Sequence, residues 1–227
     1  CSSSLVAAHL AADKIAEGGM TGVLWAGSNV TLLPTTTGMF AVAGMLAPDG
    51  RCKALDAAAN GYVRSEACVS GVMEVMNPHL EQRGSDQLTS NIGQICHGSP
   101  AAVIISGSAV NQDGRSSSLT APNGPAQQRA INIALNSASE EGRNINLLQM
   151  HGTGTSLGDP IELGAAAATL MDSAGRGGST RTSPLVLATS KSSAGHSEPA
   201  SGAVGILAAV IAAGETRTRP TFHLRFL

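Results

Sequence analysis

The chain has 227 residues, of which 42% are hydrophobic and only 2% aromatic, and its formal net charge is −2. This near-neutral charge gives no electrostatic reason to expect nucleic acid or an anionic membrane as a partner, and so few aromatic side chains leave little for base stacking. The length allows a sizeable core, whereas no apolar run approaches the ~18 residues of a membrane-spanning helix.

The four cysteines, Cys1, Cys52, Cys68 and Cys96, do not form a Cys-x-x-Cys spacing. Isolated thiols of this kind are typical of a reducing compartment, so we expect a cytoplasmic protein. Because the sequence begins without Met, we interpret it as a fragment or a processed product. Whether an organellar targeting segment precedes Cys1 is left open by the sequence. Cys96 adjoins His97, but two adjacent residues do not make a zinc site, and no metal site is expected.

Apolar residues recur at helical spacing from Leu5 to Ile15, and the pair Gly18-Gly19 supplies a stop signal. This pattern predicts a first helix with Cys1 at its N-terminal mouth. Unpaired backbone amides and the positive end of the helix dipole meet there, which favours a thiolate over a thiol. Cys1 is therefore a candidate nucleophile, although a lone cysteine is more often inert packing.

The rest of the first part predicts strands and loops. Residues 22–27 form a short apolar run that is typical of a strand buried on both faces. Residues 28–50 are predicted to be loop-rich, and a second strand is predicted around Cys68–Val75. Residues 77–100 interrupt the pattern with prolines, glycines and mixed charges, so we interpret them as a surface insertion.

Strands alternate with helices in the second part of the chain. Strands are predicted at 101–108, 145–150 and 185–189, and helices begin at Pro125, Asp159 and Pro199. Residues 173–183 are predicted to form a flexible surface loop. The alternation predicts an α/β chain with layered packing.

Two histidines occupy matching places in this pattern. His151 and His196 each follow a predicted strand, in a loop of small residues that precedes a helix. Catalytic groups gather in such loops at strand ends of α/β folds. Lys191 and Glu198 flank His196 and are expected to pair and hold its loop. One histidine alone would favour a capping or packing role, but two in matching contexts, with Cys1 at a helix mouth, favour chemistry.

Five segments resemble the successive signatures of β-ketoacyl synthases, in particular of the ketosynthase domains of modular type I polyketide synthases. They are CSSSLVAAHLA, PDGRCKALDAAANGYVR, GSAVNQDGRSSSLTAPNGPAQ, HGTGTSLGDPIE and SKSSAGHSEPASG. The resemblance covers nearly the whole chain except residues 77–100 and the loop around 173–183. It implies a thiolase-like fold of layers in the order α/β/α/β/α. It also implies that residues 1–100 are the end of the N-terminal half and 101–227 an incomplete C-terminal half of one partial ketosynthase domain.

The resemblance implies roles for individual residues as well. Cys1 corresponds to the acyl-accepting nucleophile, and His151 and His196 to the histidines that decarboxylate a malonyl extender and stabilise its enolate. A thiolate that accepts an acyl chain, beside two imidazoles that face the developing enolate oxygen, suits this chemistry.

Four further residues have supporting roles in the family. Lys191 corresponds to the lysine that supports the second histidine, and Glu198 to its usual partner. Thr153 and Thr155 match threonines that contact the phosphopantetheine arm. The chain departs from the family where Gly-Glu-Gly is replaced by Ser65-Glu66-Ala67, which adds side chains where glycines usually lie.

The first hypothesis is therefore an acyltransferase that extends an acyl chain by decarboxylative Claisen condensation, and that is inactive as an isolated segment. It binds no cofactor directly, because its substrates arrive on the phosphopantetheine of an acyl carrier protein. Expected partners are that carrier protein, neighbouring polyketide synthase domains, and a second copy that pairs along segment 22–28. Two alternatives are a non-elongating acyl gate or dimer scaffold, which the presence of His151 disfavours, and a Cys-His hydrolase, which two histidines plus a lysine disfavour.

Overall fold

The computed structural model describes residues 1–75, 103–116, 121–171 and 181–226. Its elements, in chain order, are α1 (Ser3–Ala16), β1 (Gly22–Asn29), α2 (Pro34–Val42), β2 (Ala67–Glu74), α3 (Gly124–Ser137), the 3₁₀ turn η1 (Gly142–Asn144), β3 (Leu147–Gln149), α4 (Gly158–Ala166), the π-helical turn η2 (Ala167–Met171), β4 (Val186–Ala188), α5 (Lys191–Ala194), the 3₁₀ turn η3 (Glu198–Ala200) and α6 (Ser201–Glu215). The predicted insertion at 77–100 lies outside the described residues, as does most of the loop predicted at 173–183.

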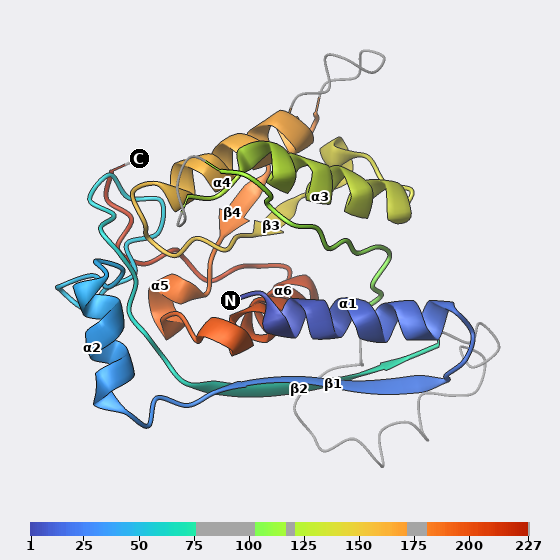
Figure 1. Cartoon of the computed structure of the whole chain (residues 1–227). Coiled ribbons are helices and arrows are strands. Elements are labelled where there is room, and N and C mark those ends of the chain that lie inside the picture. Colours follow the sequence, from blue (N-terminus) through green and yellow to red (C-terminus); the bar gives the residue numbers. More distant parts are fainter. Residues whose placement is uncertain (76–102, 117–120, 172–180, 227) are drawn as a thin grey trace.

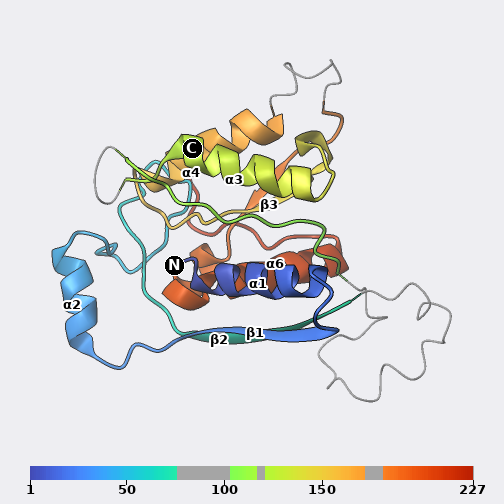
Figure 2. The same ribbon diagram turned by 45° about the vertical axis from the view of Figure 1, so that its right-hand side comes forward.

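These elements stack in layers that both ribbon views show (Figures 1 and 2). Helices α3 and α4 form one outer layer and cover the small sheet of β3 and β4. Helices α1 and α6 form the next layer, and the β1–β2 sheet lies on their other side. The order is α/β/α/β, which gives four of the five layers expected from the resemblance.

The β1–β2 pair is an antiparallel ladder whose inner face packs against the central helices. Trp25 lies opposite Gly71, and a Cβ at Gly71 would lie only 2.8 Å from the Trp25 ring, so the glycine makes room for the indole. Trp25 is buried with Ala8, Ala11 and Ala203 in the main apolar cluster. Small alanines let the helices approach the sheet closely, which explains a core with so few aromatic residues.

The expectation that the 22–27 strand is buried on both faces is wrong for the described chain. Side chains of β1 alternate between the core and solvent, and Leu24 is 70% exposed. Its cross-strand neighbour Val72 is 66% exposed on the same outer face. The physical reason is that the described residues cover only one face of this sheet, the face toward α1 and α6.

The second sheet is parallel, so the loops that follow its two strands lie at the same end of the sheet. Leu148 pairs with Leu187 in the middle of β3 and β4. Because both strands run in the same direction, the chain leaves them at the same end, at His151 after β3 and at Lys191 after β4. This arrangement brings the two histidine loops together.

Two predictions of local structure are wrong. The region 28–50 contains helix α2, which has Pro34 in its first turn and is followed by Gly44 at φ +69. Both are ordinary helix boundary signals, but the run of threonines after Pro34 obscured them. Residues 103–108 form no strand, because they have no ladder partner among the described residues; Gly107 instead packs on the last turn of α3.

The lengths and polarity of the helices also bear on membrane insertion. Within the described ranges, none of the helices combines the length and apolar character that crossing a bilayer requires.

Candidate active site

Cys1 lies two residues before the first residue of α1, and contacts with α6 hold it there. The hydroxyl of Ser201 donates a hydrogen bond to the Cys1 carbonyl oxygen at 3.1 Å. One turn further, the Ala203 amide donates to the Ser4 hydroxyl at 3.0 Å. Gly202 permits this approach, because a Cβ there would lie 2.5 Å from Leu5 Cγ. The N-terminal ends of α1 and α6 therefore meet at the cysteine, whose side chain stays exposed.

His196 reaches the cysteine sulfur directly. Its Nε2 lies 3.0 Å from Cys1 Sγ, across 195 positions of sequence. His196 is 1% exposed, and its ring packs edge-on against Tyr62, with centroids 4.9 Å apart. Its backbone is fixed as well, because its amide donates to Val63 at 2.8 Å and its carbonyl accepts from Ser65 at 3.0 Å. The ring is thus held in place from both backbone and side chain.

His151 approaches the same sulfur from the loop after β3. Its ring lies 5.3 Å from that of His196, at nearly a right angle. Cys1 Sγ and one nitrogen of each imidazole all lie within 4.8 Å of one another. The structure therefore brings together the three residues that the sequence singled out as the nucleophile and its two histidines.

The electrostatic surroundings favour neutral imidazoles. Desolvation, followed by the positive charge of Lys191, lowers the pKa of His196 to about 3. The same two causes lower the pKa of His151, although that residue is exposed, so solvent offsets part of the desolvation. Neutral rings at pH 7 can donate or accept a proton without first losing one.

Glu162 on α4 is a site residue that the sequence analysis missed. Its carboxylate accepts hydrogen bonds from the backbone amides of His151, at 2.5 Å, and Gly152, at 2.8 Å. Desolvation raises the pKa of Glu162, and these two bonds oppose that rise. The available sequence signal was an acidic residue in a helix that directly follows the histidine loop, but its partner amides could not be inferred without the fold.

Asp159 fixes the remainder of the same loop. Asp159 is 3% exposed, and its carboxylate accepts hydrogen bonds from the amides of Leu55, at 2.8 Å, and Gly154, at 3.1 Å. The loop also contains the two threonines expected to bind the substrate arm. Thr153 is buried, and its hydroxyl lies 3.4 Å from that of Thr155, which itself accepts a hydrogen bond from the amide of Gly158.

The expected pairing of Lys191 with Glu198 is wrong. Glu198 binds Arg64 instead, accepting from Nε at 2.5 Å and from Nη2 at 3.0 Å. Lys191 is 5% exposed; desolvation lowers its pKa, and the carboxylate that most opposes this effect is Glu162. Sequence proximity was misleading because the backbone at Gly195 takes a positive φ of +74 and Glu198 then pairs with Arg64, 134 positions away in the sequence.

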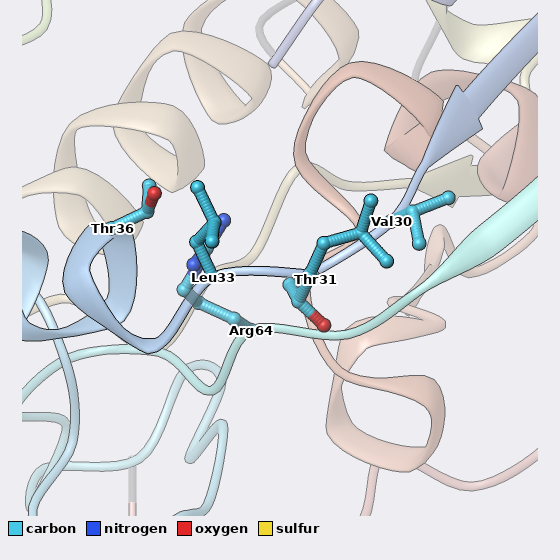
Figure 3. A pocket seen from close by; sticks show the side chains of 6 residues that line it. Val30, Thr31, Leu33, Thr36 and Arg64 are labelled. Atoms are coloured by element: carbon cyan, nitrogen blue, oxygen red, sulfur yellow. The ribbon is translucent and has the colours of Figure 1, made fainter.

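A small pocket of about 150 Å³ lies beside the Arg64 side chain, between the end of β1 and α2 (Figure 3). Its lining residues are Val30, Thr31, Leu32, Leu33, Thr36 and Arg64. None of the three clustered residues lines it, and the Arg64 guanidinium is engaged by Glu198 and Thr37. We therefore assign the chemistry to the Cys1 cluster rather than to this pocket.

Two protein-family models match the chain. The model for the N-terminal domain of β-ketoacyl synthases matches residues 1–79, and that for the C-terminal domain matches residues 102–225. Residues 80–101, which include most of the predicted insertion, fall between the two matches.

Individual relatives are polyketide synthases. The chain is 40% identical over 212 residues to a phenolphthiocerol/phthiocerol polyketide synthase of Mycobacterium tuberculosis, covering 93% of the chain and 9% of that protein. It is 39% identical to erythronolide synthase EryA2 of Saccharopolyspora erythraea, covering 93% of the chain and 5% of that protein. Thus the chain spans a small part of these relatives.

Solved structures agree with the layered arrangement. The ketosynthase from module 6 of the bacillaene synthase of Bacillus subtilis 168 superimposes with a TM-score of 0.84 at 29% sequence identity. That match covers 100% of the chain and 37% of the solved chain. The fold is therefore that of a ketosynthase, the thiolase-like fold, of which the chain represents a part.

Proposed function

The chain belongs to the β-ketoacyl synthase family, and on this basis we propose that it carries the condensing centre of a polyketide synthase ketosynthase. The reaction is a decarboxylative Claisen condensation between an acyl group on Cys1 and a malonyl-type extender on an acyl carrier protein. The observation that carries the proposal is the 3.0 Å contact between Cys1 Sγ and His196 Nε2, with the His151 ring beside it.

The first half of the reaction loads the cysteine. Cys1 Sγ attacks the carbonyl carbon of an acyl thioester on the carrier, and the carbon–sulfur bond to phosphopantetheine breaks. The Cys1 thiol loses its proton to solvent, the resulting thiolate accepts a hydrogen bond from the Nε2–H of His196, and the departing phosphopantetheine sulfur takes up a proton from solvent. A sulfur at the N-terminal ends of α1 and α6 suits this step, because both helix dipoles stabilise negative charge there.

The second half of the reaction forms the carbon–carbon bond. Loss of carbon dioxide from the extender leaves its electron pair as an enolate, whose oxygen accepts hydrogen bonds from the His151 and His196 rings. The enolate carbon then attacks the acyl carbonyl on Cys1, and the sulfur leaves as a thiolate. Neutral imidazoles suit the donor role, because a fixed N–H aimed at developing negative charge costs no reorganisation.

Supporting residues act through the histidines or the substrate arm. We propose that the positive charge of Lys191, together with the Glu162 carboxylate that interacts with it, sets the electrostatic potential around the two imidazole rings. Glu198 supports the His196 loop through Arg64. Thr153 and Thr155 are our candidates for contacts to phosphopantetheine, because their hydroxyls lie in the loop that follows His151.

The proposed partners follow from the same assignment. They are an acyl carrier protein, neighbouring polyketide synthase domains, and a second copy of the chain along segment 22–28. The outer face of β1 supports the dimer, since Leu24 and Val72 form an exposed apolar pair there. We propose that the two halves of one ketosynthase domain divide at about residue 100, which agrees with the break between the two family matches.

Other functions fit less well. An acyl gate that does not elongate would need no second histidine at the sulfur, but His151 lies there. A Cys-His hydrolase would orient its histidine with a carboxylate, whereas His196 Nδ1 has no hydrogen-bond partner among the described residues.

The experiment that tests the assignment is adduct mapping in the full-length polypeptide. After incubation with an acyl thioester, peptide mass spectrometry should find the acyl group on Cys1. Cys68 is the matched control, because it is also an exposed free thiol. An adduct mainly on Cys52, Cys68 or Cys96 would contradict the proposal.

A further inference from the structure

We propose that Cys1, His151 and His196 together bind one zinc ion. The sulfur and one ring nitrogen from each histidine lie within 4.8 Å of one another. Zinc binds thiolate sulfur at about 2.3 Å and imidazole nitrogen at about 2.0–2.1 Å, so ligand atoms around one tetrahedral ion lie roughly 3.3–3.6 Å apart. To bind one ion, Cys1 Sγ and His196 Nε2, now 3.0 Å apart, must separate by a few tenths of an ångström, and any ligand pair near the 4.8 Å limit must close by roughly 1.2–1.5 Å.

The composition of the cluster is that of a zinc site with an open position. Three protein ligands of the sulfur and imidazole type, with water in the fourth place, are typical of accessible zinc centres. Cys1 and His151 are exposed in the described chain, while the buried His196 ring is already fixed by its backbone bonds. The backbone of His151 is likewise anchored by Glu162.

Charges of both signs surround the cluster. Lys191 opposes a cation, but the carboxylates of Glu162 and Asp159 lie near enough to interact with its charge. When zinc enters, the S–H bond of Cys1 breaks, the proton passes to solvent and a Zn–S bond forms. The bound ion then carries one compensating negative charge from the thiolate.

Zinc and an acyl group should exclude each other on Cys1, and this consequence rests on the function proposed above. A thioester sulfur carries no thiolate charge and is a poor zinc ligand. Zinc should therefore inhibit loading of the free protein, whereas a protein acylated beforehand should not bind the ion. The cluster thus offers a metal-sensitive block on the first half-reaction alone.

Equilibrium dialysis with zinc chloride tests the site in the full-length polypeptide at pH 7.5. We expect one equivalent bound per chain, and Co²⁺ in its place should give a thiolate-to-metal absorption band. His151→Ala should weaken binding at least about tenfold, since even indirect partners of metal ligands contribute that much. Cys68→Ser and His223→Ala remove an exposed thiol and an imidazole outside the cluster, so they should leave affinity unchanged.

His151→Ala is the decisive variant, because its exposed ring can be removed with little effect on folding. Equal affinity in wild type and His151→Ala would overturn the proposal, as would the absence of binding in wild type at micromolar zinc. Zinc binding without condensing activity would reject the proposed function and leave this site intact, whereas activity without zinc binding would reject only the site.

Discussion

Arg64 and Glu198 form a two-bond ion pair that joins the segment before β2 to the turn after His196. The guanidinium donates from Nε at 2.5 Å and from Nη2 at 3.0 Å, and the two side chains are only 8% and 15% exposed. Arg64 and His196 also form an isolated parallel bridge of backbone hydrogen bonds. The position of the buried histidine therefore depends on a contact between residues 134 positions apart.

Glu198→Gln should weaken this contact while preserving the shape of the side chain. Loss of a charge-assisted hydrogen bond at a largely buried site is expected to lower the free energy of unfolding by roughly 1.5–3 kcal/mol. Urea denaturation measures the change. Glu215→Gln is the matched control, because its pair with Arg217 is exposed and should contribute little. Equal stabilities for both variants would contradict the role assigned to the pair.

Glu162→Gln should disturb the His151 loop. The substitution leaves one of two backbone amides facing an NH₂ group instead of an oxygen, at a cost of about 1–3 kcal/mol. If that cost falls on the transition state, carbon dioxide release from a malonyl carrier protein drops roughly 5- to 150-fold, while loading of Cys1 changes little. Glu140→Gln, at an exposed contact with Asn144, should behave as wild type. An unchanged release rate in Glu162→Gln would count against its positioning role.

The low pKa of His196 predicts a pH-dependent stability. Between its folded value of about 3 and its unfolded value of about 6.5, the unfolded chain binds the proton and the folded chain does not. Acidification through this window therefore destabilises the fold, by up to about 1.4 kcal/mol per pH unit from this group. Denaturation at pH 7.5, 6.5 and 5.5 should show the wild type losing its advantage over His196→Asn as pH falls. A constant difference across that range would mean that His196 titrates normally.

Leu24→Lys should break the proposed dimer without unfolding the protomer. Leu24 is 70% exposed, so a charge is tolerated in the separated chain but would lie in the apolar contact of two β1 strands. Sedimentation velocity distinguishes the two states. Ile133→Lys, at a half-exposed position on α3 in the outer helical layer, is the control. Trp25 is unsuitable for this test, because its ring lies in the core. If Leu24→Lys formed a dimer as stable as that of the wild type, segment 22–28 would not be the dimer interface.

The sequence was sufficient to predict which three residues would meet at the centre of the site. Their places at a helix mouth and after two strands marked Cys1, His151 and His196 as candidates, and the resemblance to ketosynthase signatures implied that they share one site. The layers themselves were also predictable, because alternating strands and helices leave few ways to bury both faces of a parallel sheet.

Contacts between distant segments were not predictable in the same way. The backbone amides that donate hydrogen bonds to Glu162 become its neighbours only when α4 packs beside the end of β3. Glu198 likewise contacts Arg64 only in the folded chain, after the turn at Gly195. Helix α2 was missed because three threonines lowered its apparent helical propensity despite proper boundary residues. Pairing between segments depends on tertiary packing, which spacing along one chain does not encode directly.

We propose that His151 acts on the extender rather than on the cysteine, and one paired assay of His151→Ala tests this role. Acyl loading of Cys1 is followed by mass spectrometry, and carbon dioxide release from a malonyl carrier protein is measured on the same full-length preparation. Loss of one donor to a developing oxyanion costs about 100- to 1,000-fold in rate. Loading should therefore persist while carbon dioxide release falls by that factor, and Lys191→Ala should resemble His196→Ala more than His151→Ala. Abolished loading with intact carbon dioxide release would instead make His151 the base for Cys1 and contradict the account.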